Sequence, residues 1–341
     1  MTPSSARVEF GIKRQDPLHR QLPTPFAADL PVMGRMIRFE TNSRSVLKRT
    51  QNVFARYPKV SHHPFDFRWR IVCESTPQSG PPWPEVFAFS DEGLCFVNFG
   101  QHSFIAIDLA AREAVGYLAE GLLADPEGFV SPFLNTLFNM TAGALRLTPL
   151  PAACVTMGEQ GLLVLGEPNN GKTTSSYLTE RLGLKFHSDG AVFLDLDDGR
   201  LRVWGDFSPA AFRMESSEFL PELRSIGRPF HYRDLTFLYV QEGTSIPSNG
   251  YPVIPISCVF LERGVANTPR LTPLNSVKSS ERLEEMHAFK DDDRFEAQHS
   301  AALRALAGVP AYQLTYGNDP AVAATFMRNI LTVHTSLEVA Q

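Results

Sequence analysis

The run GEPNNGKT, residues 166–173, constrains the fold of this chain more than any other stretch of its sequence. It follows the apolar segment Leu162–Leu165, which suits a buried strand, and it precedes an amphipathic segment from Lys172 to Leu182, which suits a helix. The pattern G-x-x-x-x-G-K-[ST] between a strand and a helix is the signature of a phosphate-binding loop. A chance run of turn-forming residues is the alternative, and the two flanking segments argue against it.

Each fixed position of this motif has a chemical role. Glycine allows a tight turn in which backbone N–H groups approach phosphate oxygens, and the helix that follows adds the positive end of its dipole. Lys172 can reach the β- and γ-phosphates of a nucleotide, and the Thr173 hydroxyl can ligate Mg²⁺. The residues expected to bind the nucleotide are Gly166, Glu167, Pro168, Asn169, Asn170, Gly171, Lys172, Thr173 and Thr174.

A phosphoryl-transfer site also needs an acid that orients magnesium or takes a proton from the acceptor. Asp189 follows Lys172 by 17 residues, beyond the expected helix and a short strand, where the chain returns toward the loop. We therefore predict that Lys172 and Asp189 are the catalytic residues, and that Thr173 and Asp189 are the metal ligands. A surface turn is the alternative for Asp189, and packing is the expected role of the neighbouring His187.

The acidic segment FLDLDD, residues 193–198, looks like a second candidate but has a different explanation. Asp198-Gly199 is a two-residue type I′ hairpin signal. Folding about it sets Asp197 opposite Arg200 and Asp195 opposite Arg202, and it gathers the leucines on one face. The acids of this hairpin are therefore expected to be structural.

The composition argues against several classes of protein. The net charge of −5 argues against a general nucleic-acid binder, which carries a basic face. The four cysteines form no CxxC pair, and Cys95, Cys154 and Cys258 lie in apolar runs, which predicts buried thiols in a reducing compartment. No apolar stretch reaches the ~20 residues of a membrane span, and the N-terminus lacks an apolar signal segment. A cytoplasmic protein without membrane or nucleic-acid partners is expected, and homo-oligomerisation is left open.

The order of expected elements gives a fold class of α/β (α+β) with three parts. Residues 1–33 carry several prolines and little periodicity, which predicts an irregular arm. Residues 34–145 are expected to form a smaller α+β domain, with helices over 110–123 and 132–145. Residues 146–341 are expected to form the nucleotide-binding domain, with further strands at 191–197, 200–204, 235–240 and 256–261.

The run Gly161–Gly205, GLLVLGEPNNGKTTSSYLTERLGLKFHSDGAVFLDLDDGRLRVWG, resembles the nucleotide-binding core of the HPr kinase/phosphorylase family. In that family the phosphate loop and its helix are followed by an acid and then a β-hairpin. The resemblance implies a phosphoenolpyruvate-carboxykinase-like fold, with ATP or ADP and Mg²⁺ at the loop. It also implies phosphoryl transfer to a hydroxyl, which is a serine of a carrier protein in the founding members. Lys172, Thr173 and Asp189 take the positions of the phosphate lysine, the magnesium ligand and the catalytic acid.

Two functions stay open at this level. The first is an ATP- and Mg-dependent phosphotransferase, a kinase of the HPr-kinase-like group, which acts on a hydroxyl of an unknown protein, peptide or small molecule. The second is a nucleotide-binding sensor or scaffold without transfer, since Gly190 stands where the founding members have a second aspartate and residues 150–156 lack their histidine. A loop that no longer binds nucleotide is a third alternative. A mobile arginine can stabilise the charge on the transferred phosphoryl group. The candidates for this role are Arg213, Arg224, Arg228 and Arg233, and the alternative is that they are solvated side chains on the surface.

Overall fold

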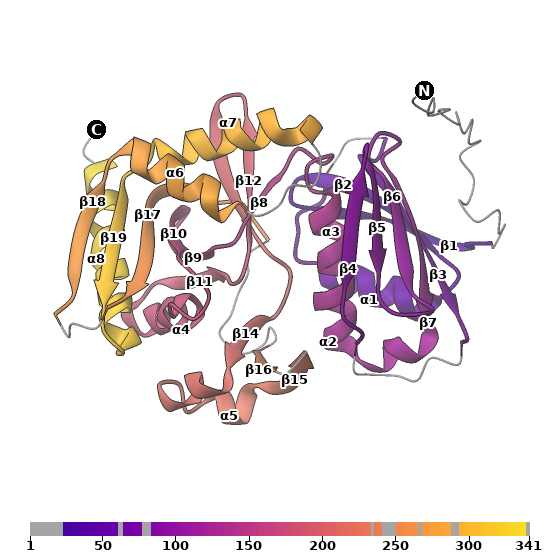
Figure 1. Cartoon of the computed structure of the whole chain (residues 1–341), viewed down its shortest axis with the longest axis horizontal. Helices are drawn as coiled ribbons and strands as arrows, with labels where there is room; N and C mark the ends of the chain where they lie inside the picture. Colours follow the sequence, from indigo (N-terminus) through magenta and orange to yellow (C-terminus); the bar gives the residue numbers. More distant parts are fainter. Residues whose placement is uncertain are drawn as a thin grey trace, which may run out of the picture.

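The computed structural model describes residues 23–60, 64–76, 83–232, 235–240, 250–264, 268–287 and 293–338. These residues form a mixed α+β structure with several separate sheets. Figure 1 shows an N-terminal sheet with its helices on the right and a second, larger group of strands and helices on the left. A small sheet lies at the bottom of that view, between the two halves.

The N-terminal sheet of the described part has seven strands in the order β1-β2-β3-β7-β6-β5-β4. The strands β2, β3 and β7 run parallel to one another, and the other neighbours are antiparallel. The strands are β1 Phe26–Val32, β2 Arg35–Thr41, β3 Phe67–Glu74, β4 Phe87–Asp91, β5 Leu94–Asn98, β6 Phe104–Asp108 and β7 Glu113–Ala119. The helical segments of this half are α1 Arg44–Phe54, η1 Glu120–Ala124, α2 Pro126–Gly128, η2 Phe129–Asn135 and α3 Thr136–Thr141.

Two expectations for this half are wrong. Part of the expected irregular arm is the edge strand β1, whose Leu30 and Val32 are buried; an edge strand tolerates Pro31, so the prolines were a misleading signal. Most of the helix expected over 110–123 is instead β7, because pairing with β3 and β6 on both sides overrides its helix-forming residues. The end of the expected range, from Glu120, is helical as part of η1. The rest of the expected arm, residues 1–22, lies outside the described residues.

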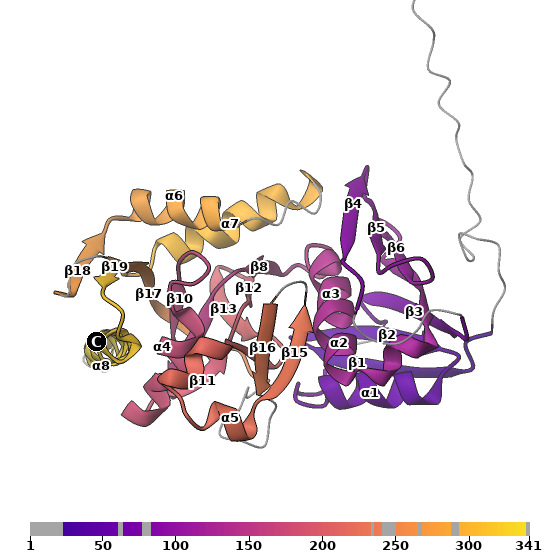
Figure 2. The same cartoon turned by 60° about the horizontal axis from the view of Figure 1, so that its bottom comes forward.

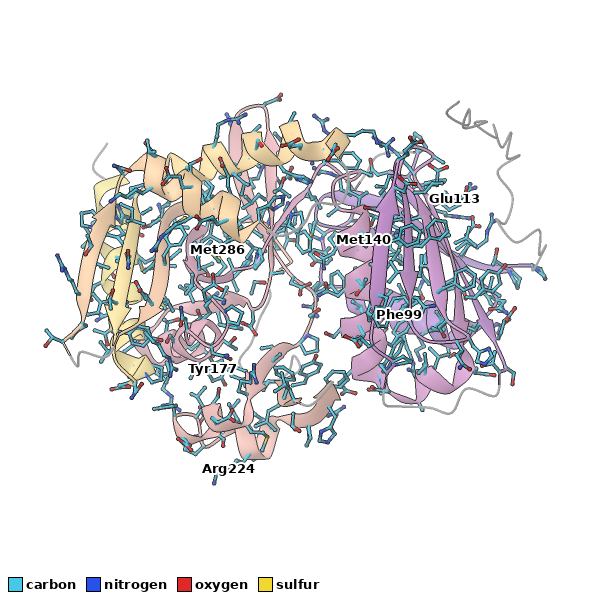
Figure 3. All side chains as sticks on the ribbon, in the orientation of Figure 1. Phe99, Glu113, Met140, Tyr177, Arg224 and Met286 are labelled. Carbon is cyan, nitrogen blue, oxygen red and sulfur yellow. The ribbon has the colours of Figure 1, made fainter. Side chains whose placement is uncertain are left out.

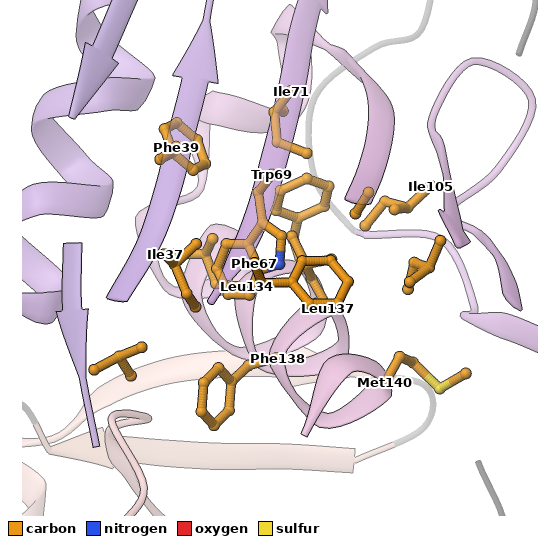
Figure 4. Packing of buried hydrophobic residues seen from close by; sticks show 14 of the residues in the cluster. Ile37, Phe39, Phe67, Trp69, Ile71, Ile105, Leu134, Leu137, Phe138 and Met140 are labelled. Carbon is orange, nitrogen blue, oxygen red and sulfur yellow. The ribbon is translucent and has the colours of Figure 1, made fainter. Parts of the chain in front are cut away.

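The buried core of the N-terminal half extends into the C-terminal half and so holds the two halves together. Ile37 and Phe39 of β2 and Trp69 of β3 face the helical segment that carries Leu137 and Phe138 (Figure 4). The same buried cluster takes in three aromatic residues from the C-terminal half, which are Phe193, Trp204 and Phe207. The Tyr57 hydroxyl donates a hydrogen bond of 3.0 Å to the Gly205 carbonyl oxygen across this contact.

The C-terminal half is built on a six-stranded sheet of described strands in the order β11-β9-β10-β17-β19-β18. Side chains alternate along β10: Leu162 and Val164 belong to one buried cluster, whereas Leu163 and Leu165 belong to another on the opposite face. The strands are β9 Ala153–Met157, β10 Gln160–Leu165, β11 Lys185–Ser188, β17 Ile254–Arg263, β18 Arg270–Leu274 and β19 Ala311–Tyr316.

Helices cover both faces of this sheet. Figure 2 shows α6 and α7 on one side and α8 on the other. Tyr177 of α4 packs with the α8 side, and Met286 of α6 packs with the opposite cluster, as their separate positions in Figure 3 illustrate. The helical segments are α4 Lys172–Leu178, η3 Thr179–Leu182, α6 Ser276–Met286, η5 Asp293–Phe295, α7 Glu296–Ala307 and α8 Pro320–Glu338.

Two three-stranded sheets complete the described part. The first orders β13 Arg200–Gly205, β12 Val192–Asp197 and β8 Thr148–Leu150, and it confirms the predicted hairpin register of Asp197 opposite Arg200 and Asp195 opposite Arg202. The second orders β14 Ala210–Arg213, β16 Leu235–Val240 and β15 Arg228–Tyr232, with η4 Met214–Glu218 and α5 Leu223–Ile226 beside it.

Two bulk expectations can be compared with the structure. Cys95, Cys154 and Cys258 are buried free thiols, as predicted. None of the helices in the described ranges combines the length and the apolar character needed to cross a membrane. The cytoplasmic location, the reducing compartment and the oligomeric state stay predictions.

Candidate functional site

The loop of residues 166–173 joins β10, an inner strand of the six-stranded sheet, to α4. Gly166 has φ +140°, and a Cβ there would lie 2.6 Å from the carbonyl oxygen of Leu261 on the neighbouring strand β17. Gly171 has φ +80°, and a Cβ there would collide with the Tyr316 hydroxyl of β19. Both glycines are therefore required by close contact with the sheet as well as by the turn.

The strands β17 and β19 also fix the shape of the loop through hydrogen bonds. The Tyr316 hydroxyl donates a hydrogen bond of 2.7 Å to the Asn170 carbonyl oxygen. The Asn170 side chain donates one of 3.0 Å to the Leu261 carbonyl oxygen, so this amide is committed to the sheet. The loop tip, Glu167, Pro168 and Asn169, is exposed.

The Lys172 side chain extends back along the loop that precedes it and contacts the start of that loop. Its Nζ donates to the carbonyl oxygens of Gly166, at 2.6 Å, and Glu167, at 3.1 Å. Burial lowers the pKa of this ammonium, and the charges of Asp189 and Glu167 act in the opposite direction. Helix α4 begins at Lys172, and no described side chain caps its first turn, so the amides there stay available to an anion.

Asp189 lies directly beside the loop. The Thr173 hydroxyl donates a hydrogen bond of 2.7 Å to Asp189 Oδ1, and the Ala211 amide of β14 donates one of 3.1 Å to Oδ2. Burial raises the pKa of Asp189, whereas the hydrogen bonds from Thr173, Ala211 and Gly190 and the charge of Lys172 lower it. The structure thus brings together the three residues Lys172, Thr173 and Asp189, although their chemical roles stay predictions.

The remaining sequence candidates lie elsewhere. The buried Thr174 hydroxyl shares a hydrogen bond of 2.9 Å with the Ser216 hydroxyl of η4, which joins α4 to the small sheet. Arg213 stacks on Phe237, and Arg224 donates to Ser217. Arg228 pairs with Glu127 of α2 at 3.3 Å, so the three described arginines have partners away from the loop, and Arg233 lies outside the described residues.

Sequence reasoning missed Arg263, the last residue of β17. Its Nη2 lies 3.5 Å from the point that a Cβ of Gly171 would occupy, so this exposed guanidinium sits beside the phosphate loop. Arg263 reaches the loop because β17 runs parallel to β10 and the carboxyl ends of parallel strands meet at the same edge of a sheet. What could not be deduced was that the two strands are neighbours.

A cavity of about 250 Å³ is lined in part by Asp189. Asp206 lines it as well, and accepts hydrogen bonds from the Phe207 amide at 2.6 Å and the Asn135 side chain at 2.9 Å. Burial raises the pKa of Asp206 to about 6, against hydrogen bonds from Ser208 and Phe207 that lower it. The sequence carried no local signal for this cavity, because its walls come from both halves of the molecule.

The donor set at Thr173 and Asp189 fits magnesium held together with a nucleotide. Within the described residues, no group of three or more His, Cys, Asp or Glu side chains could hold a metal ion on its own. Magnesium in nucleotide sites commonly takes only one or two protein ligands and completes its shell with water and phosphate oxygens. One hydroxyl and one carboxylate, 2.7 Å apart, match that requirement.

Comparisons with known proteins give only a distant relationship. No family model matches this chain, and no curated protein matches it. Among solved structures, it is similar to the HPr(Ser) kinase/phosphatase from Coxiella burnetii, with a TM-score of 0.31 and 12% sequence identity over 56% of this chain and 95% of that chain. A likeness at this level assigns neither an activity nor a substrate.

Proposed function

We propose that this chain is an ATP- and Mg²⁺-dependent phosphotransferase that transfers a phosphoryl group to a hydroxyl. The observation that carries the proposal is the hydrogen bond of 2.7 Å between Thr173 and Asp189, next to Lys172 and an uncapped first turn of α4. This combination supplies a cation, free amides, a hydroxyl and a carboxylate within one short segment of structure. Adenine is preferred over guanine because the sequence has no Asn-Lys-x-Asp motif.

Each of these residues has one task in the proposed reaction. The amides at the start of α4 and the Lys172 ammonium bind the terminal phosphates, which orients the γ-phosphoryl group. Thr173 and Asp189 would hold magnesium, which neutralises charge on the phosphate oxygens when it is bound. Asp189 also accepts the proton of the attacking hydroxyl as a general base.

A nucleotide sensor is the second candidate. It is favoured by the single acid, since Gly190 follows Asp189, and by the position of Lys172, whose ammonium already bonds two loop carbonyls. A sensor would bind ATP at the same loop and use the nucleotide to change the contact between Asp189 and β14. The phosphotransferase and the sensor would therefore both bind ATP, and only the phosphotransferase would turn it over.

Calorimetry with ATP, with and without Mg²⁺, tests the proposal together with a turnover assay. Lys172→Ala should weaken ATP binding roughly 10–100-fold, because a charge-assisted contact is lost. Asp189→Asn should keep the ATP affinity measured without Mg²⁺ within about threefold of the wild-type value, lose the gain in affinity from Mg²⁺, and lower turnover by roughly 10²–10⁴-fold, the range of a general base. Asp197→Asn, at an exposed hairpin acid, is the matched control and should leave both quantities unchanged.

Two outcomes would contradict the phosphotransferase. ATP binding without turnover in the wild type would favour the sensor. ATP affinity that does not respond to Mg²⁺ or to Lys172→Ala would remove the nucleotide site itself.

A further inference from the structure

The cavity beside Asp189 lies between the two halves of the molecule. Asn52 and Val53 of α1, with Arg56 just after it, form one side, and His187 of β11, Asp189 and Ser208 belong to the other. Asp189 therefore contacts the phosphate loop, through Thr173, and also lines this cavity. A molecule in the cavity can bring a hydroxyl to the carboxylate that faces the nucleotide site.

Its size limits what can enter. The volume of about 250 Å³ lies below the range of about 300–1,000 Å³ that drug-sized ligands occupy. At roughly 30 Å³ for each water molecule, it corresponds to about eight waters. The surface of a folded protein does not fit such a space, and a serine side chain alone would leave most of it unfilled.

The walls combine neutral hydrogen-bonding groups and apolar surface with three charged side chains, Arg56, Asp189 and Asp206. The Asn52 amide is exposed at the cavity, and the buried Nε2 of His187 has no hydrogen-bond partner among the described residues. Val53, Val130 and Phe207 add apolar surface. The two carboxylates outnumber the single Arg56 guanidinium, which disfavours an anionic occupant. An apolar occupant would leave Asn52 and His187 unpaired at a free-energy cost.

We propose that this cavity binds the phosphoacceptor, and that the acceptor is a small uncharged polyhydroxylated molecule of the sugar or polyol class. Several hydroxyls satisfy the amide and imidazole groups, and the carbon skeleton covers the valine and phenylalanine side chains. The identity of the acceptor rests on the proposed phosphotransferase, whereas occupancy of the cavity does not.

The acceptor hydroxyl oxygen attacks the γ-phosphorus of ATP while its proton passes to the Asp189 carboxylate. The bond between the γ-phosphorus and the β–γ bridging oxygen breaks, and that oxygen keeps the electron pair as ADP leaves. The products are a phosphate monoester and ADP.

Binding of the acceptor class can be measured without ATP. Saturation-transfer NMR with glucose, ribose, myo-inositol and glycerol, and with a seryl peptide for comparison, tests the cavity directly. Asn52→Trp fills the cavity from an exposed position of α1, and Gln51→Trp adds the same ring at the neighbouring exposed position that does not line it. At least one sugar or polyol should bind the wild type and Gln51→Trp, and its affinity should fall at least tenfold in Asn52→Trp. Both variants should keep the wild-type unfolding temperature within about 3 °C, since both sites are exposed.

The outcomes separate the two proposals. Sugar or polyol binding that Asn52→Trp abolishes supports the cavity, and ³¹P NMR with ATP and Mg²⁺ should then detect its phosphate monoester. If such binding is found but ATP does not bind, the cavity stands and the phosphotransferase fails. If ATP binds while no sugar or polyol binds, if binding is equal in Asn52→Trp, or if only the peptide is phosphorylated, the acceptor proposal is wrong.

Discussion

Asp189 and Asp195 lie six residues apart on the same stretch of chain, but their partners differ in kind. Asp195 is buried and accepts a hydrogen bond of 2.8 Å from the Arg35 guanidinium and one of 3.2 Å from the Trp204 indole. Asp189 accepts from a hydroxyl and from backbone amides, without an arginine partner among the described residues. A buried carboxylate with a dedicated arginine counterion is fixed in a structural role. A carboxylate held by a hydroxyl at a phosphate loop can exchange that partner for a metal or a proton.

The largest expected effect concerns the structural acid. Asp195→Ala should lower the free energy of unfolding by about 3–5 kcal/mol, because it leaves the partly buried Arg35 without its counterion. Urea denaturation measures this loss. ATP affinity of the folded variant should stay at the wild-type value, which separates this acid from Asp189. A loss below about 1 kcal/mol, the upper limit for an exposed ion pair, would show that this ion pair is not structural.

The hairpin and the loop were predictable because their signals are local. The turn at Asp198-Gly199 and the alternation around it specify every pair of β12 and β13. However, the sequence assigned Arg202 as the partner of Asp195, whereas the ion pair forms with Arg35, 160 residues away, and Arg202 approaches Asp197 instead. Pairing between strands sets the backbone register, but burial against the other half decides which charged side chains meet.

The residues of the candidate site also divide into those that have a local sequence signal and those that do not. Local spacing identified Lys172, Thr173 and Asp189, since one strand, one loop and one helix carry them. Arg263 and the cavity depend on which strands are neighbours and on how the halves pack, and no local pattern encodes either. The strands β1 and β7 were missed for the same reason, because pairing with neighbours outweighs proline content and helix propensity.

A third aspartate, Asp206, differs from both Asp189 and Asp195 in the pH dependence that it gives to stability. The pKa of Asp206 is about 6, raised by burial above its ordinary value of 3.8, so the unfolded chain releases this proton first as pH rises. The stability from the protonated form is complete below about pH 4 and is lost as pH rises through 6, which amounts to about 3 kcal/mol. Asp206→Asn removes this titration. Relative to the wild type, its free energy of unfolding should therefore rise by about 3 kcal/mol between pH 4 and pH 7.

Denaturation of both proteins across this pH range gives the test as a difference. The nearby His187, whose pKa burial lowers to about 4, has the opposite dependence, but it is present in both proteins and cancels. A constant difference from pH 4 to pH 7 would mean that Asp206 has an ordinary pKa and is held like a surface acid.

Substitution of one glycine in the phosphate loop and one in the hairpin compares the two turns directly. Gly166→Ala should cost about 2 kcal/mol of stability and weaken ATP binding at least tenfold, because its Cβ would press on the Leu261 carbonyl and displace the loop. Gly199 also has a positive φ, but a Cβ there meets nothing within 4 Å, so Gly199→Ala should cost about 1 kcal/mol and leave ATP binding unchanged. Equal ATP affinities in the two variants would argue against a loop whose shape serves the nucleotide.

The smallest expected effect belongs to Arg263, which tests how far the functional region extends beyond the sequence motif. Its guanidinium is exposed beside Gly171, so screening limits its contribution, and Arg263→Ala should weaken ATP binding by about 1 kcal/mol, or roughly fivefold. AMP, which lacks the terminal phosphates, should bind the variant and the wild type equally. Arg304→Ala, at an exposed arginine of α7, is the matched control and should change neither affinity. Calorimetry at low and high salt measures these differences, and the loss in Arg263→Ala should shrink at high salt. A loss that is the same for AMP and ATP would mean that Arg263 supports the fold at this edge and does not contact the phosphates.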